Sequence, residues 1–381
     1  MIIKLADLKP VCANIASVID NNAMSEIATT IQLGVFDTKL KINYTNKQYF
    51  VSSKIPVTDV MNVPPFSAVI KADTFIKLIS KLNDETVDIV LDDNKATLDV
   101  ITATGKYTFA TIDAVDAFDK QYSNFNIADD NVDVSYSIDN GVLHNIIDYS
   151  NTEFGKVPDS IAKSNVMYRM CYLDSQGSIA MSGGACIYNA NVEVDNGVYL
   201  TDKLLKLLKL FNHDTQYNIN IKTGTAAVLN NVVQQKIEFT SDNMEIYAIL
   251  PSNTAIKLPV DKVRQMATTA LPNTVNIDTN NLAQVLDRFS IFVDGTSVVD
   301  TVTLEFTADN VKVRNEALEN VDVVNYINSI SLEQPYVVKV CLSELLTTLN
   351  NYETAVSIDF GVNTNIVLHN EHVTNIIPCI K

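Results

Sequence analysis

Histidine and cysteine, the residue types that most often bind metals or act as nucleophiles, are sparse and poorly spaced in this sequence. A zinc site needs ligands that converge, as the two histidines of an HExxH motif do on one face of a helix. His369 and His372 are three residues apart in a segment that alternates like a strand, and the five cysteines include no CxxC pair. We therefore expect neither a metal site nor a cofactor.

Two glycine-containing segments lack the spacing of the phosphate-binding and catalytic motifs. Gly105-Lys106 has no glycine five residues before it and no Ser or Thr after it, so it is not a P-loop. Ser182-Gly183-Gly184 does not fit GxGxxG, and no serine lies in a GxSxG motif. These absences weaken the case for an enzyme, although an enzyme whose site residues are dispersed along the chain stays an open alternative.

Length and composition limit the classes of protein that remain. The chain has 381 residues and 47% hydrophobic residues, enough for two or three domains with a real core. Its net charge of -17 argues against a nucleic-acid binder with a uniformly basic surface. We find no secretory signal and no apolar run long enough to cross a membrane, and the scattered cysteines suggest reduced thiols. We therefore expect a cytoplasmic protein.

Three segments repeat one pattern, in which a short amphipathic helix is followed by an Asn-rich turn and an alternating strand. The helical spacing covers 75–82, 204–211 and 345–349, and the strand alternation follows at 87–91, 219–221 and 356–360. A second helix is predicted upstream in each copy, over 5–20, 141–147 and 279–289. We expect short strands elsewhere, apart from an extra helical piece over 260–272.

The repeat predicts an α+β fold of three similar domains, each with two helices packed on antiparallel sheets. We place the domains at 1–129, 130–256 and 257–381, with the second boundary near the candidate linker at Pro251-Ser252-Asn253-Thr254.

Basic side chains gather on the predicted helices at similar positions of the repeat. Lys203, Lys206 and Lys209 are three residues apart, so they cover about 120° of one helix face. Most helical lysines are simply solvated, but these have few acidic partners in an acidic chain, which favours contact with nucleic-acid phosphates. The predicted DNA-facing residues are Lys71, Lys77, Lys81, Lys203, Lys206, Lys209 and Arg288. The third copy supplies only the last of them.

At this level of pattern the chain resembles the bacterial-type DNA polymerase sliding clamp, the β processivity factor. Its divergent motifs favour a phage member of this family. The resemblance covers nearly the whole chain but has few diagnostic identities. Four segments carry the resemblance. Residues 104–112 are similar to the family's "sG+..F.l.tl" strand, and residues 181–187 are similar to its "aTDGhRLa" segment. Residues 247–251 resemble the end of the family's second domain, and residues 375–381 resemble its C-terminal tail "vvMPmRl".

The resemblance implies a function without catalysis. The chain would form a head-to-tail homodimer of three-domain subunits, closed into a ring that encircles double-stranded DNA and tethers the polymerase. Contact with DNA would be non-specific, and an acidic exterior with basic inner helices would reconcile the net charge with DNA binding. The polymerase and the clamp loader would dock short peptides in a pocket between domains two and three.

Site residues carried over by matching positions fall into two groups. The peptide-binding pocket would comprise Ser182, Gly184, Ile187, Met244, Ile249, Asn375, Ile377, Pro378 and Cys379. The subunit interface would comprise Leu78, Leu82, Phe109, Ile291 and Phe292. The family's Thr-Asp-Gly-His-Arg-Leu is replaced by Ser-Gly-Gly-Ala-Cys-Ile, and the tail methionines are replaced by Ile377 and Cys379. The peptide preference would therefore differ from that of the family's usual partners.

The main alternative is a non-catalytic β-rich structural or assembly protein, viral proteins included, in which the helices merely cover sheets. The tripled helix–strand unit favours the clamp over this alternative.

Overall fold

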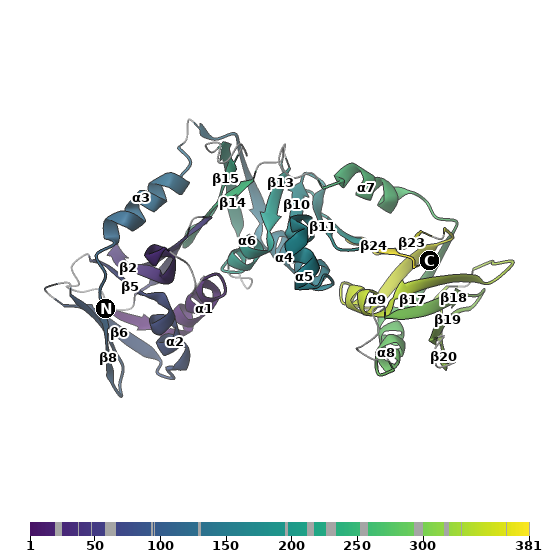
Figure 1. The fold of residues 1–381 in the computed structure, drawn as a ribbon, viewed down its shortest axis with the longest axis horizontal. Coiled ribbons are helices and arrows are strands. Elements are labelled where there is room, and N and C mark those ends of the chain that lie inside the picture. The colour runs from purple at the N-terminus through teal and green to yellow at the C-terminus, as the bar shows by residue number, and fades with distance from the viewer. Residues whose placement is uncertain are drawn as a thin grey trace. The chain divides into compact units, whose positions relative to one another are not determined.

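A computed structural model covers the chain (Figure 1). The structure describes residues 1–381 except 20–24, 37, 47, 58–65, 93, 95, 129–130, 195–196, 212–216, 226–233, 252–257, 293–299, 316–319, 329, 363 and 381.

The order of helices and strands repeats three times as strand, helix, four strands, helix, three strands. The first copy contains β1 (Ile2–Lys4), α1 (Leu5–Ala16), β2 (Thr30–Phe36), β3 (Lys39–Thr45), β4 (Tyr49–Pro56), β5 (Ser67–Lys71), α2 (Ala72–Lys81), β6 (Thr86–Leu91), β7 (Thr97–Ile101) and β8 (Lys106–Ala110). The second contains β9 (Val134–Asp139), α4 (Asn140–Gly155), β10 (Met170–Asp174), β11 (Gly177–Met181), β12 (Ala185–Asn189), β13 (Val198–Thr201), α6 (Asp202–Leu208), β14 (Asn218–Thr225), β15 (Gln234–Ser241) and β16 (Met244–Pro251). The third contains β17 (Asn273–Asp278), α8 (Thr279–Ser290), β18 (Thr301–Phe306), β19 (Asn310–Asn315), β20 (Asn320–Asn325), β21 (Tyr336–Cys341), α9 (Leu342–Leu349), β22 (Ala355–Phe360), β23 (Asn365–His369) and β24 (Val373–Pro378). This order confirms the predicted α+β class and the tripled unit.

Further helices lie outside this repeat. They are η1 (Glu26–Thr29), α3 (Val115–Phe125), α5 (Asp159–Ser164), η3 (Val166–Arg169) and α7 (Val260–Thr268). Helix α7 confirms the extra helical piece expected after residue 260. The expectation of short strands outside the named helices is wrong for α3, which follows β8 and packs through Phe118 and Phe125 on an aromatic cluster.

Strand pairing forms two eight-stranded and two four-stranded antiparallel sheets. The eight-stranded sheets have the orders β5-β2-β3-β4-β16-β15-β14-β9 and β13-β10-β11-β12-β24-β23-β22-β17. The four-stranded sheets have the orders β1-β6-β7-β8 and β20-β19-β18-β21. Each eight-stranded sheet therefore joins four strands of one copy to four strands of the next, across the seams β4–β16 and β12–β24.

The chain divides into two compact units, and each is described by itself. Unit 1 contains residues 1–144 and 203–255, and unit 2 contains residues 145–202 and 256–381. The middle copy is thus shared between the units. The predicted domain boundaries at 129/130 and 256/257 lie outside the described residues and stay a prediction.

Each unit has a helix that lies across one face of its eight-stranded sheet (Figure 1). Helix α3 covers the β4–β16 seam of unit 1, where it packs on Phe50, Val69 and Tyr247. Helix α7 covers the β12–β24 seam of unit 2, where Val263 packs among Ile187, Val367 and Ile376. The paired helices α1 and α2 of unit 1 bury the main hydrophobic core, which includes Phe75.

Candidate functional site

The tip of the β11–β12 hairpin in unit 2 contains two glycines, and one of them lies against β24, the neighbouring strand of the same sheet. A Cβ atom on Gly184 would lie 2.0 Å from the carbonyl oxygen of Ile376 on β24, whereas one on Gly183 would meet no atom within 4 Å. The Gly184 amide donates to the Ser182 hydroxyl at 3.1 Å, and the Ser182 amide donates to the Gly184 carbonyl. Only glycine at 184 permits this close approach of the two strands.

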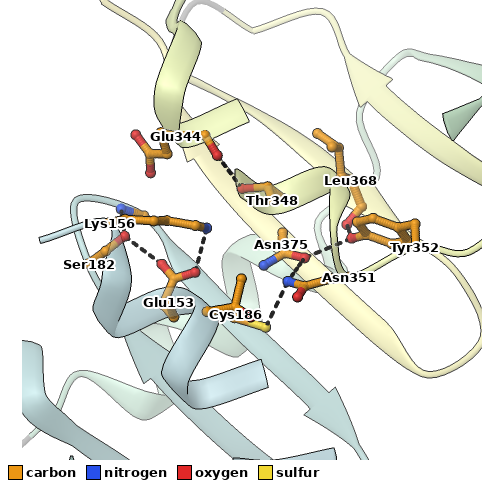
Figure 2. A network of polar contacts seen from close by, with 12 residues as sticks. Glu153, Lys156, Ser182, Cys186, Glu344, Thr348, Asn351, Tyr352, Leu368 and Asn375 are labelled. Carbon is orange, nitrogen blue, oxygen red and sulfur yellow. Dashed lines mark hydrogen bonds and ion pairs between the residues drawn. The ribbon is translucent and has the colours of Figure 1, made fainter. Parts of the chain in front are cut away.

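A buried ion pair lies beside this tip, at the end of α4 (Figure 2). Nζ of Lys156 lies 2.5 Å from Oε2 of Glu153, and their side chains are 4% and 0% exposed. The Ser182 hydroxyl donates to Oε1 of the same carboxylate at 2.5 Å. A buried carboxylate requires such partners, since its desolvation is otherwise uncompensated. The pair therefore fixes the end of α4 against the β11–β12 hairpin.

A second carboxylate, that of Glu344 in the first turn of α9, lies close to the same lysine (Figure 2). Burial raises the pKa of Glu344 above its usual value, the charge of Lys156 opposes this rise, and the charge of Glu153 adds to it. Oε1 of Glu344 is buried and makes no hydrogen bond within the described part of the chain. Lys156 therefore forms an ion pair with Glu153, and its charge also acts on the carboxyl group of Glu344.

A buried amide network joins β12 and β24 to the turn after α9 on one face of the sheet (Figure 2). The Asn351 amide nitrogen lies 3.2 Å from Oδ1 of Asn375 and 3.8 Å from the sulfur of Cys186. The Tyr352 hydroxyl lies 2.6 Å from the carbonyl of Leu368 and 2.9 Å from Oδ1 of Asn375. Burial raises the pKa of the Cys186 thiol to about 12, so this thiol stays neutral and serves as a packing residue.

A cavity of about 340 Å³ opens next to the hairpin tip. Ser182, Lys156 and Glu344 contribute its polar lining. The other side is apolar and is lined by Val157, Pro158, Ile161 and Tyr168. Ile161 is 49% exposed and Val166, close to it in the chain, is 55% exposed, which leaves an apolar rim open to solvent.

The strand register divides the predicted pocket residues of unit 2 between the two faces of the sheet. Ala185 pairs with Ile376, and Cys186 pairs with Asn375. Because side chains alternate along a strand, Ile187 and Ile376 share the face covered by α7. Asn375 and Ile377 belong to the opposite face. The structure therefore does not bring Ile377 together with Ile187, and it places Ile376 there instead.

The other predicted pocket residues are more scattered. Met244 and Ile249 lie on β16 of unit 1, where Met244 lines a cleft of about 930 Å³ and Ile249 packs against the cluster under α3. In unit 2, Pro378 ends β24, and the amide of Cys379 donates to the carbonyl of Thr364. Burial raises the pKa of the Cys379 thiol to about 11. Ser182, Gly184 and Ile187 remain close to the hairpin tip and its β12 strand.

The predicted DNA-facing side chains are all exposed, but some of them form ion pairs with acidic side chains of the same chain. Lys77 lies 2.7 Å from Asp73, Lys71 lies 3.6 Å from Glu26, and Arg288 pairs with Asp322. For Lys81, Lys203 and Lys206 no ion pair is found among the described residues. Helix α6 alternates between exposed lysines and buried leucines, the latter being Leu204, Leu205, Leu207 and Leu208.

The predicted interface residues differ in exposure. Ile291 and Phe292, just after α8, are 78% and 51% exposed. Leu78 and Phe109 are partly buried against the core of unit 1, where the rings of Phe109 and Phe75 have centroids 5.7 Å apart, and Leu82 is buried. The residues that follow α8 thus form an exposed apolar surface, while those of the first copy contribute more to their own core.

Several residues of the β11–β12 region are absent from the sequence prediction. In the sequence Glu153 and Lys156 resemble ordinary surface charges, and their burial follows from tertiary packing that includes the Ser182 hydroxyl. Ile376 is not among the predicted pocket residues, because the sequence alone does not show which of Ile376 and Ile377 shares a face with Ile187. Among the described residues, no cluster of three His, Cys, Asp or Glu side chains could hold a metal ion, and no described helix is long and apolar enough to span a membrane.

This three-fold arrangement of helix pairs on shared antiparallel sheets is the sliding-clamp fold. Residues 1–120 match the family model described as DNA polymerase III beta subunit, N-terminal domain. Over its whole length the chain is similar to the DNA polymerase III beta subunit of Thermotoga maritima, with 13% identity, a TM-score of 0.77 and coverage of 100% of this chain and 98% of that chain. The corresponding subunit of Borrelia burgdorferi, solved with a natural product, has 16% identity, a TM-score of 0.75 and the same coverage. A Pseudomonas aeruginosa clamp bound to griselimycin has 15% identity and a TM-score of 0.76, with coverage of 100% and 99%. No curated protein sequence matches the chain.

Proposed function

We propose that this protein is a DNA sliding clamp, a non-catalytic processivity factor that encircles duplex DNA and tethers the replicative polymerase. The observation that carries the proposal is the fold, which agrees with bacterial clamps along the full length of both chains. The match of residues 1–120 to the N-terminal domain of the beta subunit supports the same function. Such a protein acts in the cytoplasm, where the polymerase and its loader meet DNA.

The strand order supports closure of two copies head to tail. Strands β4 and β12 occupy the same place in successive copies of the repeat, and they pair with β16 and β24. The equivalent strand of the third copy is β20, and the equivalent of β16 and β24 in the first copy is β8. Both β8 and β20 are edge strands of four-stranded sheets, so β20 of one copy and β8 of another would complete an eight-stranded sheet of the same kind.

Exposed apolar side chains lie where this contact would form. Ile291 and Phe292 are exposed beside the third copy's edge, and Val321 and Val323 are exposed on β20 itself. Tyr107 on β8 is 39% exposed. We therefore assign Ile291 and Phe292 to the interface, together with Leu78, Leu82 and Phe109 on the opposing side. An unpaired edge with apolar neighbours would otherwise favour aggregation.

DNA contact would be electrostatic and independent of sequence. Lys81, Lys203 and Lys206 are exposed on helices and have no ion pair among the described residues, which favours them over Lys71, Lys77 and Arg288. A clamp must slide, so a small number of lysines that meet phosphates through a hydrated contact fits the function better than a dense basic patch.

Partners would dock short segments at the β11–β12 hairpin of unit 2. The cavity beside Ser182 offers an apolar lining with an exposed rim, and Ile187 lies further along β12, where α7 buries it. Two proteins of this fold have been solved with a ligand, the Borrelia burgdorferi subunit with a natural product and the Pseudomonas aeruginosa clamp with griselimycin. The residues we retain for this role are Ser182, Gly184 and Ile187, together with Pro378 at the end of β24 and Cys379 directly after it.

Retention on circular DNA tests the clamp function directly. The protein, loaded onto nicked circular DNA by a clamp loader or by transient opening in low salt, should stay bound during gel filtration at moderate salt, and linearising the DNA should release it. This difference arises because a ring is linked to a circle but slides off an end. Equal release from circular and linear DNA, or a mass of one chain rather than about twice 42.0 kDa, would overturn the proposal.

A further inference from the structure

The apolar face of the β12–β24 seam has a cover that belongs to the same chain. The buried side chains on this face are Ile179, Ala185, Ile187, Val367 and Ile376. Helix α7 packs on them through Val263, and Val260, Met266 and Ala267 of the same helix are partly buried there. An aliphatic surface of this kind, with the helix removed, would be open to solvent directly beside the hairpin tip.

The equivalent cover in unit 1 is much more firmly packed. Helix α3 buries Phe118 and Phe125 to 0% and 2% exposure, and its Tyr122 packs edge-on against Tyr247, with ring centroids 5.6 Å apart. Helix α7 buries only Val263. Burying a phenylalanine contributes more than burying a valine, because the apolar area removed from water is larger. The two helices occupy equivalent seams, yet apolar packing holds α7 much less strongly.

A bidentate ion pair between Arg264 and Asp174 also holds α7 on the sheet. Nη1 and Nη2 of Arg264 on α7 lie 2.7 and 2.5 Å from the two carboxylate oxygens of Asp174 at the end of β10. The two side chains are 20% and 15% exposed. Two parallel N–H···O bonds between a guanidinium and a partly buried carboxylate are stronger and more directional than an ordinary surface pair. The Arg264–Asp174 pair is therefore a strong polar contact that adds to the modest apolar packing of α7.

We propose that α7 is a displaceable cover, and that a short partner segment with aliphatic side chains at the same spacing takes its place on the β12–β24 seam. The side chains of α7 indicate what such a segment must carry. Val260, Val263 and Met266 recur every three residues, so the segment needs aliphatic side chains at that spacing. It also needs a cation at the place of Arg264 to pair with Asp174. This inference rests on the proposed function, because the partner is a protein that the clamp recruits. Breaking the Arg264–Asp174 pair opens the surface, and a partner segment competes with α7 for it.

A peptide supplied in trans tests the cover. A fluorescent peptide of residues 258–271 keeps Arg264, so it should bind the full-length R264A protein, in which Asp174 has lost its ion pair, at least tenfold more tightly than the unchanged protein. Amide hydrogen exchange in 261–268 should accelerate in R264A while that in 115–125 does not change. The matched control is K262A, which removes an exposed cation from the same helix and should change neither readout. A second variant, D174A, should also release α7 but should bind the peptide more weakly than R264A does.

Two results would overturn the proposal. One is equal peptide affinity and equal exchange in R264A and the unchanged protein, which would make α7 a fixed part of the fold. The other is tight peptide binding by R264A that persists when Val263 of the peptide is replaced by Asp, which would place the peptide elsewhere. Neither readout involves DNA, so a failure here is distinct from loss of ring closure or of retention on circular DNA.

Discussion

Ala185 lies directly opposite Ile376 in the antiparallel pair of β12 and β24, and this register decides which side chains of the last strand can share a surface with Ile187. A shift of one residue would exchange the two faces. The carbonyl of Ile376 also passes so close to Gly184 that no side chain fits between them. The seam is thus fixed by a backbone contact as well as by strand hydrogen bonds.

Replacing Gly184 by Ala should destabilise unit 2. The new methyl group would lie 2.0 Å from the Ile376 carbonyl, so β12 and β24 would have to move apart. We expect the free energy of unfolding in urea to fall by about 2–4 kcal/mol. Gly183→Ala is the control, since a Cβ there meets nothing within 4 Å and should change stability by less than ~0.5 kcal/mol. Equal effects of the two changes would contradict the close approach.

Replacing Glu344 by Gln should stabilise the protein at neutral pH. The pKa of Glu344 is raised by burial, so its proton is held more strongly in the folded than in the unfolded state. Its contribution to stability is therefore present at low pH and is lost as the pH rises through the folded pKa. The E344Q variant should be more stable at pH 7, by on the order of 1 kcal/mol, and this advantage should vanish below the ordinary value of 4.5. Urea unfolding at both pH values measures it, and an advantage independent of pH would exclude this cause.

Replacing Lys203 and Lys206 by Ala should weaken binding to DNA. Both side chains are exposed beside buried leucines, so the change should leave the fold intact. The logarithm of the binding constant for duplex DNA should then depend less steeply on the logarithm of salt concentration, by up to ~0.9 for each phosphate that no longer meets a lysine. Lys77→Ala serves as the comparison, because Lys77 is already paired with Asp73 at 2.7 Å and should alter the slope less. An unchanged slope in the double variant would show that these lysines do not face DNA.

Replacing Ile291 by Asp should prevent closure of the dimer. The side chain is 78% exposed in the single chain, so a charge there costs little in folding but would be buried without a partner in the head-to-tail interface. We expect the dissociation constant to rise at least 100-fold, measured by sedimentation equilibrium. Ile327→Asp is the control, since that isoleucine is 63% exposed but is not assigned to the interface. A dimer unaffected by I291D would exclude the assignment.

Much of the fold follows from sequence periodicity, and much of the site does not. The change from a 3.6-residue to a two-residue period marks the transitions from α2 to β6 and from α9 to β22. Helix α3 has a helical period as well, since Phe118, Tyr122 and Phe125 recur at intervals of four and three residues, but it lies outside the repeated unit, where we predict strands. Two adjacent apolar residues such as Ile376 and Ile377 give no sign of which one faces Ile187. That choice depends on the pairing of β24 with β12, which are separated by most of the second half of the chain.

The same limit applies to charge. Glu153 in the last turn of α4 and Lys156 directly after this helix are three residues apart, a spacing typical of exposed pairs, yet the tertiary packing removes both from water. Asp73, the partner of Lys77, lies four residues earlier on the same helix, so the sequence alone could have shown this pair, whereas Asp322, the partner of Arg288, lies on β20. Sequence patterns report which residues share a helix face, whereas ion pairs between distant segments depend on tertiary contacts.

The two eight-stranded sheets each cross from one copy of the repeat to the next, and this has a consequence for how such a chain can change length. The middle copy presents β12 to its successor and β16 to its predecessor, and the ends of the chain present β20 and β8. Excising the middle copy would leave β4 and β24 free, which are edges of the two complementary kinds that already pair with β16 and β12. A whole copy can therefore be removed or added, and the two edge strands that remain unpaired are still of the two kinds that pair with each other. The number of copies in one chain does not change which kinds of edge strand its ends present.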